Sequence, residues 1–391
     1  MTSKWNKVPL RELVGYISKG IAPSYATEET ETTIKVLNQK CNRNFKINYG
    51  DSKLHDTQKK KIPAERYVKP DDILINSTGT GTAGRIAQIE VVPCATTIDG
   101  HMILIRSNGK VTQKFLGYAL KAHQWEVLQL DEGSTGQTEL NRDRLLDEIM
   151  INYPLSFDEQ NAIVDTLESI DRKMVVNKQQ NDNLADLLQT IYQERFGDIS
   201  MAANQGVLSD ICSYSKDRVA VSELNATTYF STENMLPEKA GSTEATSLPT
   251  ASQTTACHKG DILISNIRPY FKKIVYCENE CGCSADVLCF TPNQSHYTAY
   301  LFSTLYADKF FAFMVAGSKG TKMPRGDKQQ IMTYPVALPS AEELEGFNIV
   351  ALPLLEQVCA NRAESKRLSS LRDTLLPKLM SGEIDVSTVQ L

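Results

Sequence analysis

The sequence predicts an α+β protein in which a mixed α/β module occurs twice and two long helices join the copies. Three observations support this: the composition is that of a globular chain, several segments recur about half a chain apart, and each copy closes with a long helical pattern. With 391 residues, of which 41% are hydrophobic and 23% charged, the chain can fill hydrophobic cores, so disorder is excluded as its main state. The expected parts are a first domain at 1–155, a long helix at 156–200, a second domain at 201–340, and a long helix with a C-terminal tail at 341–391.

Charge is unevenly distributed along the chain. Against a formal net charge of −5, residues 38–69 contain nine basic and three acidic residues, while residues 156–200 contain nine acidic and four basic residues. The overall charge excludes a uniformly basic coat for nucleic acid but leaves room for a local phosphate-binding patch. No stretch approaches the roughly 18 apolar residues of a membrane span, and the N-terminus lacks the apolar region of a secretion signal. Nine cysteines, an odd number, indicate reduced thiols, so we expect a cytoplasmic protein without membrane contact.

The internal repeat is visible in short matching segments. Residues 72–77 read DILINS and residues 261–266 read DILISN, while GSTG at 133–136 returns as GSKG at 317–320. The offset between copies falls from 189 to 184 residues, which is too long for a solenoid and indicates two copies of one module.

Each copy opens with short, β-branched apolar runs separated by turn residues. These runs predict strands at 34–37, 73–75, 103–105, 262–264 and 273–276, with helices interleaved at 112–130 and 297–315. Ten of the 25 residues at 231–255 are Ser or Thr, which predicts a mobile loop or an edge segment there.

The long helical patterns carry a heptad seam with steps of four and three residues. The residues expected to pair the helices are Ile163, Leu167, Ile170, Met174, Leu184, Leu188, Leu354, Val358, Leu368 and Leu375. An antiparallel pair of helices would bury both seams at once; the alternative is two separate amphipathic helices, each on its own domain. Asn177, Asn181 and Asn361 interrupt the seams and would fix register at a cost in stability. Pro353 should kink or start the second helix.

Catalytic and metal motifs do not assemble from the sequence. The G-x-G-x-x-G at 79–84 follows a strand, but another strand-like run comes next where a dinucleotide fingerprint would open a helix. Cys277, Cys281, Cys283 and Cys289, with Cys257 nearby, lack the paired spacing of zinc sites and suit buried strand positions. We therefore expect no catalytic residue, no metal and no cofactor in this chain.

Polar loops at matched places in the two copies favour nucleic-acid contacts. Arg and Asn can bind base edges with two hydrogen bonds, whereas Lys, Ser and Thr suit phosphate. The candidate DNA-binding residues of the first copy are Lys40, Arg43, Asn76, Ser77, Thr78, Arg85, Ser134, Gln137, Asn141 and Arg142. Those of the second copy are Asn266, Arg268, Tyr270, Lys272, Lys273, Ser318, Lys319, Lys322 and Arg325. The alternative is that each loop is an ordinary solvated loop repeated by duplication of the scaffold.

The layout resembles the specificity (S) subunits of type I restriction-modification systems. The residues that carry the resemblance are FDEQ at 157–160 with the seam that follows, STENM at 231–235, GDILISNIRPYFKK at 260–273 and LRDTLLPKLMSGEI at 371–384. Together they span nearly the whole chain, and 260–273 is the most specific stretch. Pro353 and the EELEG at 342–346 depart from the usual opening of the second helix.

This resemblance implies two target-recognition domains, each reading one half of a split double-stranded DNA site, and a coiled-coil spacer formed by the two helices. It also implies two modification subunits that dock on the helices and methylate adenine with S-adenosylmethionine, and restriction subunits that use ATP and Mg²⁺. None of that chemistry would lie in this chain. Two alternatives remain open: a stand-alone DNA-binding repressor with a coiled-coil spacer, and a DNA-cleaving enzyme whose site the motifs do not reveal.

Overall fold

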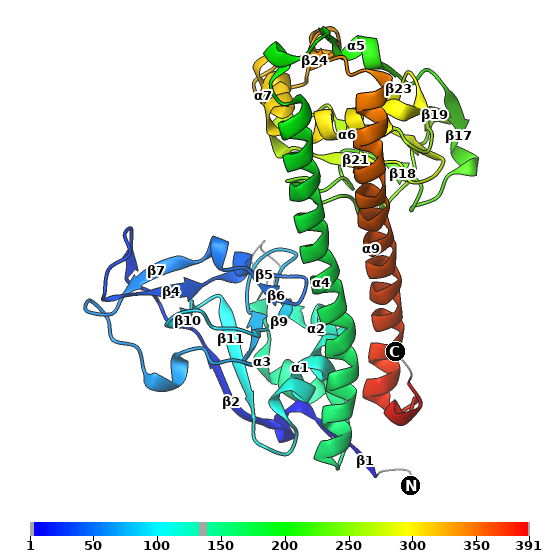
Figure 1. Cartoon of the computed structure of the whole chain (residues 1–391). Helices are drawn as coiled ribbons and strands as arrows, with labels where there is room; N and C mark the ends of the chain where they lie inside the picture. The colour runs from blue at the N-terminus through cyan, green and yellow to red at the C-terminus, as the bar shows by residue number, and fades with distance from the viewer. Residues whose placement is uncertain (1–3, 133–138, 390–391) are drawn as a thin grey trace. The chain divides into compact units, whose positions relative to one another are not determined.

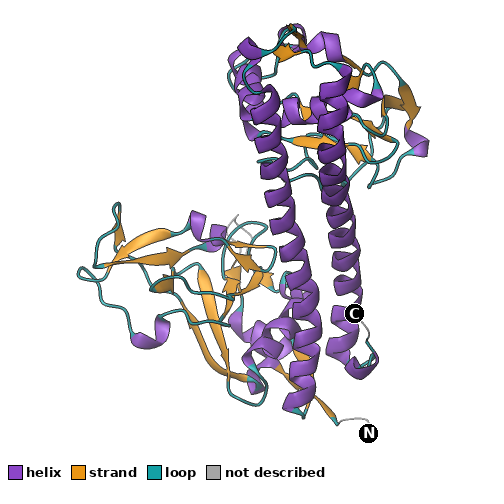
Figure 2. Cartoon of the chain, in the orientation of Figure 1, coloured by secondary structure: helices purple, strands orange, loops and turns teal. Residues whose placement is uncertain are grey.

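The computed structural model describes residues 4–132 and 139–389, and the chain divides into two compact units (Figure 1). Unit 1 comprises residues 1–174 and 366–391, and unit 2 comprises residues 175–365. The division falls inside two long helices, α4 (Phe157–Phe196) and α9 (Ala341–Ser381), so both helices contribute to both units. Each unit combines strands and helices (Figure 2). In the described part of the chain, no helix has the length and apolar content needed to cross a membrane.

Unit 1 contains two four-stranded sheets. The central sheet is antiparallel, in the order β2 (Val14–Lys19), β11 (Met102–Ser107), β8 (Ile73–Asn76) and β9 (Ile86–Gln88). The outer sheet has the order β10 (Thr96–Ile98), β4 (Thr33–Leu37), β7 (Lys53–Asp56) and β3 (Tyr25–Ala26), with β10 parallel to β4. Three two-strand ladders pair β1 (Trp5–Pro9) with β14 (Met150–Pro154), β5 (Asn42–Arg43) with β6 (Lys46–Ile47), and β12 (Asp131–Glu132) with β13 (Glu139–Leu140). The shorter helices are α1 (Gln113–Ala122), α2 (Gln124–Val127) and α3 (Arg142–Glu148).

Unit 2 repeats the central sheet of unit 1, which confirms the internal repeat, whereas its outer sheet differs in strand order and direction. Its central sheet has the order β16 (Cys212–Tyr214), β23 (Val287–Pro292), β20 (Ile262–Ser265) and β21 (Ile274–Tyr276). Its outer sheet has the order β17 (Arg218–Ala220), β19 (Gln253–Cys257), β22 (Cys281–Cys283) and β18 (Tyr229–Phe230). The strand that opens the copy again pairs with the strand before the long helix, β15 (Gln205–Val207) with β24 (Pro335–Ala337). The shorter helices are α5 (Leu208–Ile211), α6 (Thr298–Tyr306), α7 (Asp308–Ala316) and α8 (Lys328–Met332).

Alternate residues of each central sheet enter two different cores. In β8, Ile73 and Ile75 face the core beneath α1 and α4, while Leu74 faces the core against the outer sheet. In β20, Ile262 and Ile264 face the helices and Leu263 faces the outer sheet. Because side chains alternate along a strand, a sheet that is covered on both faces needs apolar residues at consecutive positions. This explains why the strands read as unbroken apolar runs in the sequence.

The long helices run antiparallel, as the seam predicted. Within unit 1, Ile163 and Leu167 of α4 share a core with Leu375 of α9. Within unit 2, the rings of Phe196 and Phe347 meet edge to face with centroids 5.4 Å apart. Residues late in α4 thus meet residues early in α9, which requires opposite directions.

The seam is not apolar throughout. Asn177 is fully buried, and its side-chain nitrogen donates to Glu364 Oε2 at 2.7 Å and to Ser365 Oγ at 3.2 Å. Asn361 donates to Asn181 Oδ1 at 2.9 Å, so these residues form a polar layer between the helices. Several predicted seam residues are only half buried, namely Met174, Leu184, Leu354 and Leu368. Leu355, the neighbour of Leu354, is buried, which shows that the α9 seam shifts by one residue there.

Pro353 does not start the second helix, which was one of the two effects expected of it. Helix α9 begins at Ala341 and continues past Pro353 to Ser381. Proline removes one N–H donor and leaves the carbonyl four residues earlier without its helical partner. That carbonyl belongs to Ile349, a residue that is 71% exposed. Water can therefore hydrogen-bond to the carbonyl, and the helix tolerates the proline.

Residues 231–252 form neither helix nor strand, as expected for a loop, although the last three residues of the predicted segment belong to β19. The loop is tied down at Asn234, which is buried. Its side-chain nitrogen donates to the Tyr229 carbonyl at 2.9 Å and to the Thr243 carbonyl at 3.1 Å.

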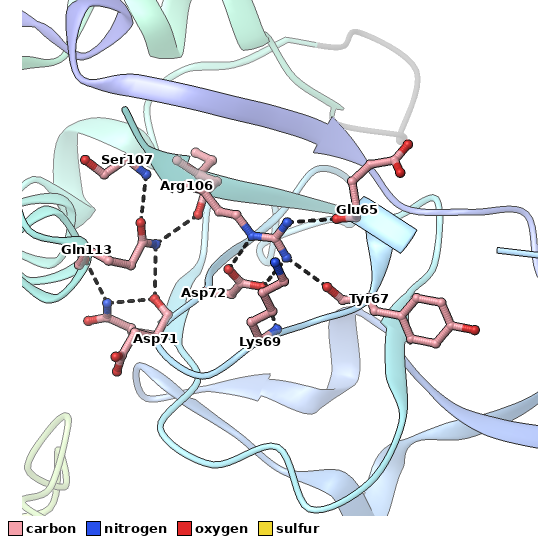
Figure 3. A network of polar contacts seen from close by, with 10 residues as sticks. Glu65, Tyr67, Lys69, Asp71, Asp72, Arg106, Ser107 and Gln113 are labelled. Carbon is pink, nitrogen blue, oxygen red and sulfur yellow. Dashed lines mark hydrogen bonds and ion pairs between the residues drawn. The ribbon is translucent and has the colours of Figure 1, made fainter. Parts of the chain in front are cut away.

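A buried ion pair fixes the start of β8 in unit 1 (Figure 3). Arg106 donates from Nε and Nη2 to the two carboxylate oxygens of Asp72, each at 2.7 Å. The same guanidinium donates to the carbonyls of Glu65 and Tyr67 at 2.8 Å, so it also holds the preceding loop. The Asp72 and Arg106 side chains are 3% and 18% exposed, which makes this a bidentate pair largely removed from water.

Candidate nucleic-acid interface

Two loops of unit 2 meet at the end of β20. We call residues 266–273 the Arg268 turn and residues 317–326 the Lys319 hairpin. The Arg268 N–H donates to the Pro324 carbonyl at 2.8 Å, and the Gly326 N–H donates to the Asn266 carbonyl at 3.2 Å. The structure therefore brings together the candidate residues of the second copy from two separate segments.

The Arg268 turn has an unusual backbone. A short helical turn, Pro269–Phe271, lies between Arg268 with φ 51° and Lys272 with φ 50°. Positive φ is unfavourable for residues other than glycine, so such a conformation persists where surrounding contacts hold it. The turn exposes Tyr270, which is 47% exposed, whereas Arg268 is half buried and donates from Nη2 to the Lys322 carbonyl at 3.5 Å.

The Lys319 hairpin carries the exposed positive charge of this surface. Lys319 and Arg325 pair through their backbones at 2.9 and 3.0 Å. Their side chains are 82% and 54% exposed, although each has an acidic neighbour, Asp327 at 2.6 Å and Asp286 at 3.0 Å. Lys322 is exposed at the tip. These are the charges that a phosphate backbone could approach.

Other candidates of the second copy are used inside the unit. Asn266 is buried, and Ser318 donates from its hydroxyl to the Val315 carbonyl at 2.7 Å. Lys272 pairs with Asp308 at 3.1 Å, and Lys273 donates to the Thr232 carbonyl at 2.5 Å. Burial lowers the pKa of Lys273. Lys272, Lys273 and Ser318 thus have partners inside the unit and Asn266 is buried, while direct contact of these residues with DNA stays a prediction.

The corresponding place in unit 1 is the end of β8. Asn76 is fully buried; it donates from Nδ2 to the Gln39 carbonyl at 3.1 Å and accepts from Asn42 at 3.2 Å. Ser77 is also fully buried, and its carbonyl accepts from the Leu140 N–H at 2.8 Å. Direct contact with DNA is thus at odds with the positions of Asn76 and Ser77. Their bonds instead join three loops at one place: residues 39–43, 77–84 and 139–142.

The glycine-rich motif forms a turn between strands. Gly79, Gly81 and Gly84 have φ values of 116°, 69° and 83°, and the chain continues into β9, which pairs antiparallel with β8. Gly79 has a φ of 116°, which residues with a side chain rarely adopt, and a Cβ there would also lie 2.5 Å from Gln39 Oε1. The motif is therefore a hairpin turn and lacks the helix start that binds a dinucleotide phosphate.

The remaining candidates of unit 1 differ in exposure. Lys40 and Arg43 are exposed, as is Arg142 at the first position of α3. Arg85 folds back and donates to the Gly81 carbonyl at 3.1 Å, while Asn141 caps α3 by accepting from two backbone N–H groups. Thr78 is half buried, with its hydroxyl 2.7 Å from His101 Nδ1. Ser134 and Gln137 lie outside the described residues.

Sequence reasoning missed several residues of these surfaces. His101 and Asp286 occupy equivalent places in the two copies, and comparing residues 99–105 with 284–290 could have marked them. The partners of the Arg268 turn, Lys239 and Asp308, come from distant segments and left no local signal.

The clustered cysteines of unit 2 lie in the core between its two sheets. Cys257, Cys277, Cys281, Cys283 and Cys289 are all buried there, with the sulfurs of Cys277 and Cys281 3.5 Å apart. Among the described residues, no group of three or more His, Cys, Asp or Glu side chains is arranged to hold a metal ion.

Comparisons with known proteins connect the fold to a family. Residues 2–185 match the family model of the type I restriction modification DNA specificity domain. The specificity subunit of the type I restriction enzyme MjaIX from Methanocaldococcus jannaschii is 30% identical over 94 residues, which cover 24% of this chain. The match spans about a fifth of the length of that relative, 21%.

The crystal structure of the S subunit of a type I restriction-modification system from M. genitalium has the same fold. The TM-score is 0.54 at 16% identity, and the match covers 97% of this chain and 96% of that chain. The likeness thus extends over both copies and both long helices. Together, the comparisons show that residues 2–185 resemble the type I restriction modification DNA specificity domain and that the whole chain has the fold of a type I S subunit.

Proposed function

We propose that this chain is the DNA-reading subunit of a type I restriction-modification complex and that each unit reads one half of a bipartite DNA site. The observation that carries the proposal is the recurrence of the same loop arrangement in both units. The Ser77 N–H donates to the His101 carbonyl at 2.8 Å, and at the equivalent place the Asn266 N–H donates to the Asp286 carbonyl at 2.8 Å. A repeated scaffold with two similar surfaces suits a DNA site with two parts.

The two surfaces carry different side chains, which favours an asymmetric site. Unit 1 presents a glycine-rich turn flanked by Lys40, Arg43 and Arg142, whereas unit 2 presents Arg268 and Tyr270 beside the Lys319 hairpin. Arg268 has donors that suit guanine, and the exposed Lys and Arg groups suit phosphate. Unlike loops on like scaffolds would read unlike bases.

The long helices are proposed to set the gap between the half-sites and to dock the partner subunits. Helix α4 has 40 residues and α9 has 41, and each is about 60 Å long at 1.5 Å per residue. The partners are two adenine methyltransferase subunits, which would bind S-adenosylmethionine and methylate the site, and restriction subunits, which would use ATP and Mg²⁺. This chain would act with them in the cytoplasm and contribute recognition without catalysis.

A genome-wide map of methylated adenine tests the proposal. We expect deletion of the gene to abolish methylation at a single split motif and to leave all other motifs unchanged. Restoring the gene on a plasmid should bring the motif back, and this controls for effects on neighbouring genes.

An unchanged map in a strain that expresses the methyltransferase would contradict the proposal. Tight binding of the purified chain to DNA without any methyltransferase would then favour a stand-alone repressor, and cleavage of DNA by the purified chain with Mg²⁺ would favour an enzyme.

A further inference from the structure

We propose that Asp308 is a positioning residue for DNA recognition: it fixes the Arg268 turn in its reading conformation and withholds the charge of Lys272 from DNA. This inference rests on the proposed function and deepens it for the surface of unit 2. Asp308 would thus have two effects on the Arg268 turn. It would hold Arg268 and Tyr270 in place to read bases, and it would prevent Lys272 from binding the phosphates of any DNA sequence.

The carboxylate of Asp308 binds two lysines through one oxygen. Its Oδ1 lies 2.8 Å from Lys239 Nζ and 3.1 Å from Lys272 Nζ. The lysine side chains are 16% and 31% exposed, so both are held close to the protein. Asp308 is the first residue of α7, where the helix dipole favours a negative charge. Lys239 and Lys272 hold the pKa of Asp308 below its usual value, which keeps the carboxylate ionised at neutral pH.

Lys239 connects this ion pair to the backbone of the Arg268 turn. The Glu238 N–H donates to the Phe271 carbonyl at 2.8 Å, and the Lys239 N–H donates to the Lys272 carbonyl at 3.0 Å. The Lys239 ammonium also lies 4.5 Å from the centre of the Tyr306 ring, a distance that suits a cation–π contact. Two carbonyls of the turn are thus bound by a segment whose side chain is anchored on Asp308 and Tyr306.

The turn needs such an anchor because its own conformation is unfavourable. Arg268 and Lys272 both have positive φ, and neither is glycine. Without Asp308, Lys239 and Lys272 would lose their shared partner, and the turn could relax toward ordinary backbone geometry. Arg268 and Tyr270 would then no longer be presented in one defined orientation.

The same change would release a positive charge beside the DNA surface. Each lysine that neutralises a phosphate releases about one counterion, so it steepens the dependence of log affinity on log salt by about 0.9. Phosphate contacts carry no sequence information. Loss of Asp308 should therefore weaken recognition of the half-site and strengthen binding to DNA of any sequence.

The test uses the full chain purified in complex with its methyltransferase subunits and three duplexes. One duplex carries the split motif found by methylation mapping, and the other two have one or the other half scrambled. For Asp308→Asn we expect about a tenfold loss of discrimination at one half only, and a salt slope on scrambled DNA that is steeper by about one. Asp308→Glu keeps the charge and should restore the salt slope.

Two further variants separate the effects. Asp308→Asn combined with Lys272→Met should return the salt slope to the wild-type value while discrimination stays low. Glu12→Gln is the matched control, because Glu12 pairs with Lys110 at 3.6 Å on the surface of unit 1, outside the long helices and the candidate DNA-binding residues, and its loss changes the net charge equally. This control should change neither discrimination nor salt slope.

The outcomes distinguish the inference from the proposed function. If Asp308→Asn leaves both discrimination and salt slope unchanged, the inference is overturned. Equal loss at both halves with a lower unfolding temperature also overturns it, because the role of Asp308 would then be structural. A wild-type complex that does not discriminate among the duplexes contradicts the proposed function itself, and this inference with it.

Discussion

At the scale of single residues, the two copies differ at the buried aspartate that precedes the central strand. Asp72 has Arg106 as a bidentate partner, whereas the residue equivalent to Arg106 in unit 2 is Thr291. Asp261 is 1% exposed and accepts from the His258 N–H at 2.8 Å and from the Cys289 thiol at 3.2 Å. Burial raises the pKa of Asp261, because the ionised form lacks water and its remaining contacts compensate only in part.

We expect Asp72→Asn to destabilise unit 1 by about 3–5 kcal/mol, because it leaves Arg106 buried without its counter-charge. Asp261→Asn should cost less than about 1 kcal/mol at neutral pH, since the amide keeps an acceptor for the His258 N–H and removes a buried charge. Urea unfolding of both variants and the wild type measures the difference. Equal losses in the two variants would contradict the comparison.

The sign of the pH effect follows from the raised pKa of Asp261. Between the unfolded value of about 3.9 and the higher folded value, the native state binds more protons, so the stability of unit 2 falls as pH rises. The Asp261→Asn variant should lack this contribution, and its stability relative to wild type should therefore improve with pH in that window.

At the scale of elements, local patterns predicted the strands well and the helices in part. The β-branched runs identified β8, β11, β20 and β21 because these strands are buried on both faces, which demands consecutive apolar residues. The helix predicted at 112–130 breaks at His123 into α1 and α2, and the helix predicted at 297–315 breaks at the extended Ala307. Such breaks depend on packing against the sheet, which local sequence does not encode.

The candidate site was predicted less completely than the fold. The sequence identified the loops, since turn residues and basic residues stand out. It did not indicate which side chains of these loops form hydrogen bonds within the protein. Asn76 and Asn266 are both buried, and Asn76 donates to the Gln39 carbonyl, although asparagine at a strand end equally suits contact with a base. The contact between Lys239 and Asp308 joins residues 69 positions apart, and no local pattern can show it.

The polar layer of the long helices gives a prediction at the same scale. Asn361→Leu should destabilise unit 2 by about 1–3 kcal/mol, because Asn181 loses its donor and Gln357, which donates to Asn361 Oδ1 at 2.8 Å, loses its acceptor. Urea unfolding measures the change, and Gln180→Leu on the exposed face of α4 is the control, with an expected change within about 0.5 kcal/mol.

Replacing the layer on both helices should behave differently. In Asn177→Leu with Asn361→Leu, two buried amides give way to an apolar seam, so stability should recover relative to the single variant. The polar layer would then serve register more than stability. A double variant less stable than the sum of the single variants would contradict this view.

At the scale of the whole molecule, the proposed reading of one half-site by each unit predicts that the two recognition functions can be separated. Replacing residues 201–340 with the same region of a related specificity subunit should change one half of the methylated motif and leave the other half intact. The physical reason is that this region contains both loops of the unit 2 surface, while every described candidate residue of unit 1 lies outside it. Methylation mapping of the hybrid measures the result. A change in both halves of the motif would contradict the model in which the two units recognise DNA independently.

The discontinuity of unit 1 has a consequence for biosynthesis. Residues 366–391 belong to unit 1, and four of them, Leu375, Leu376, Leu379 and Met380, are buried in its main core. During translation, the first 174 residues emerge early but cannot close this core until the end of the chain has been made. Unit 2 is continuous at 175–365 and has all its residues sooner. Unit 1 is therefore synthesised first but completes its folding last. Until then its incomplete hydrophobic core stays exposed, and the nascent chain must be protected from aggregation there.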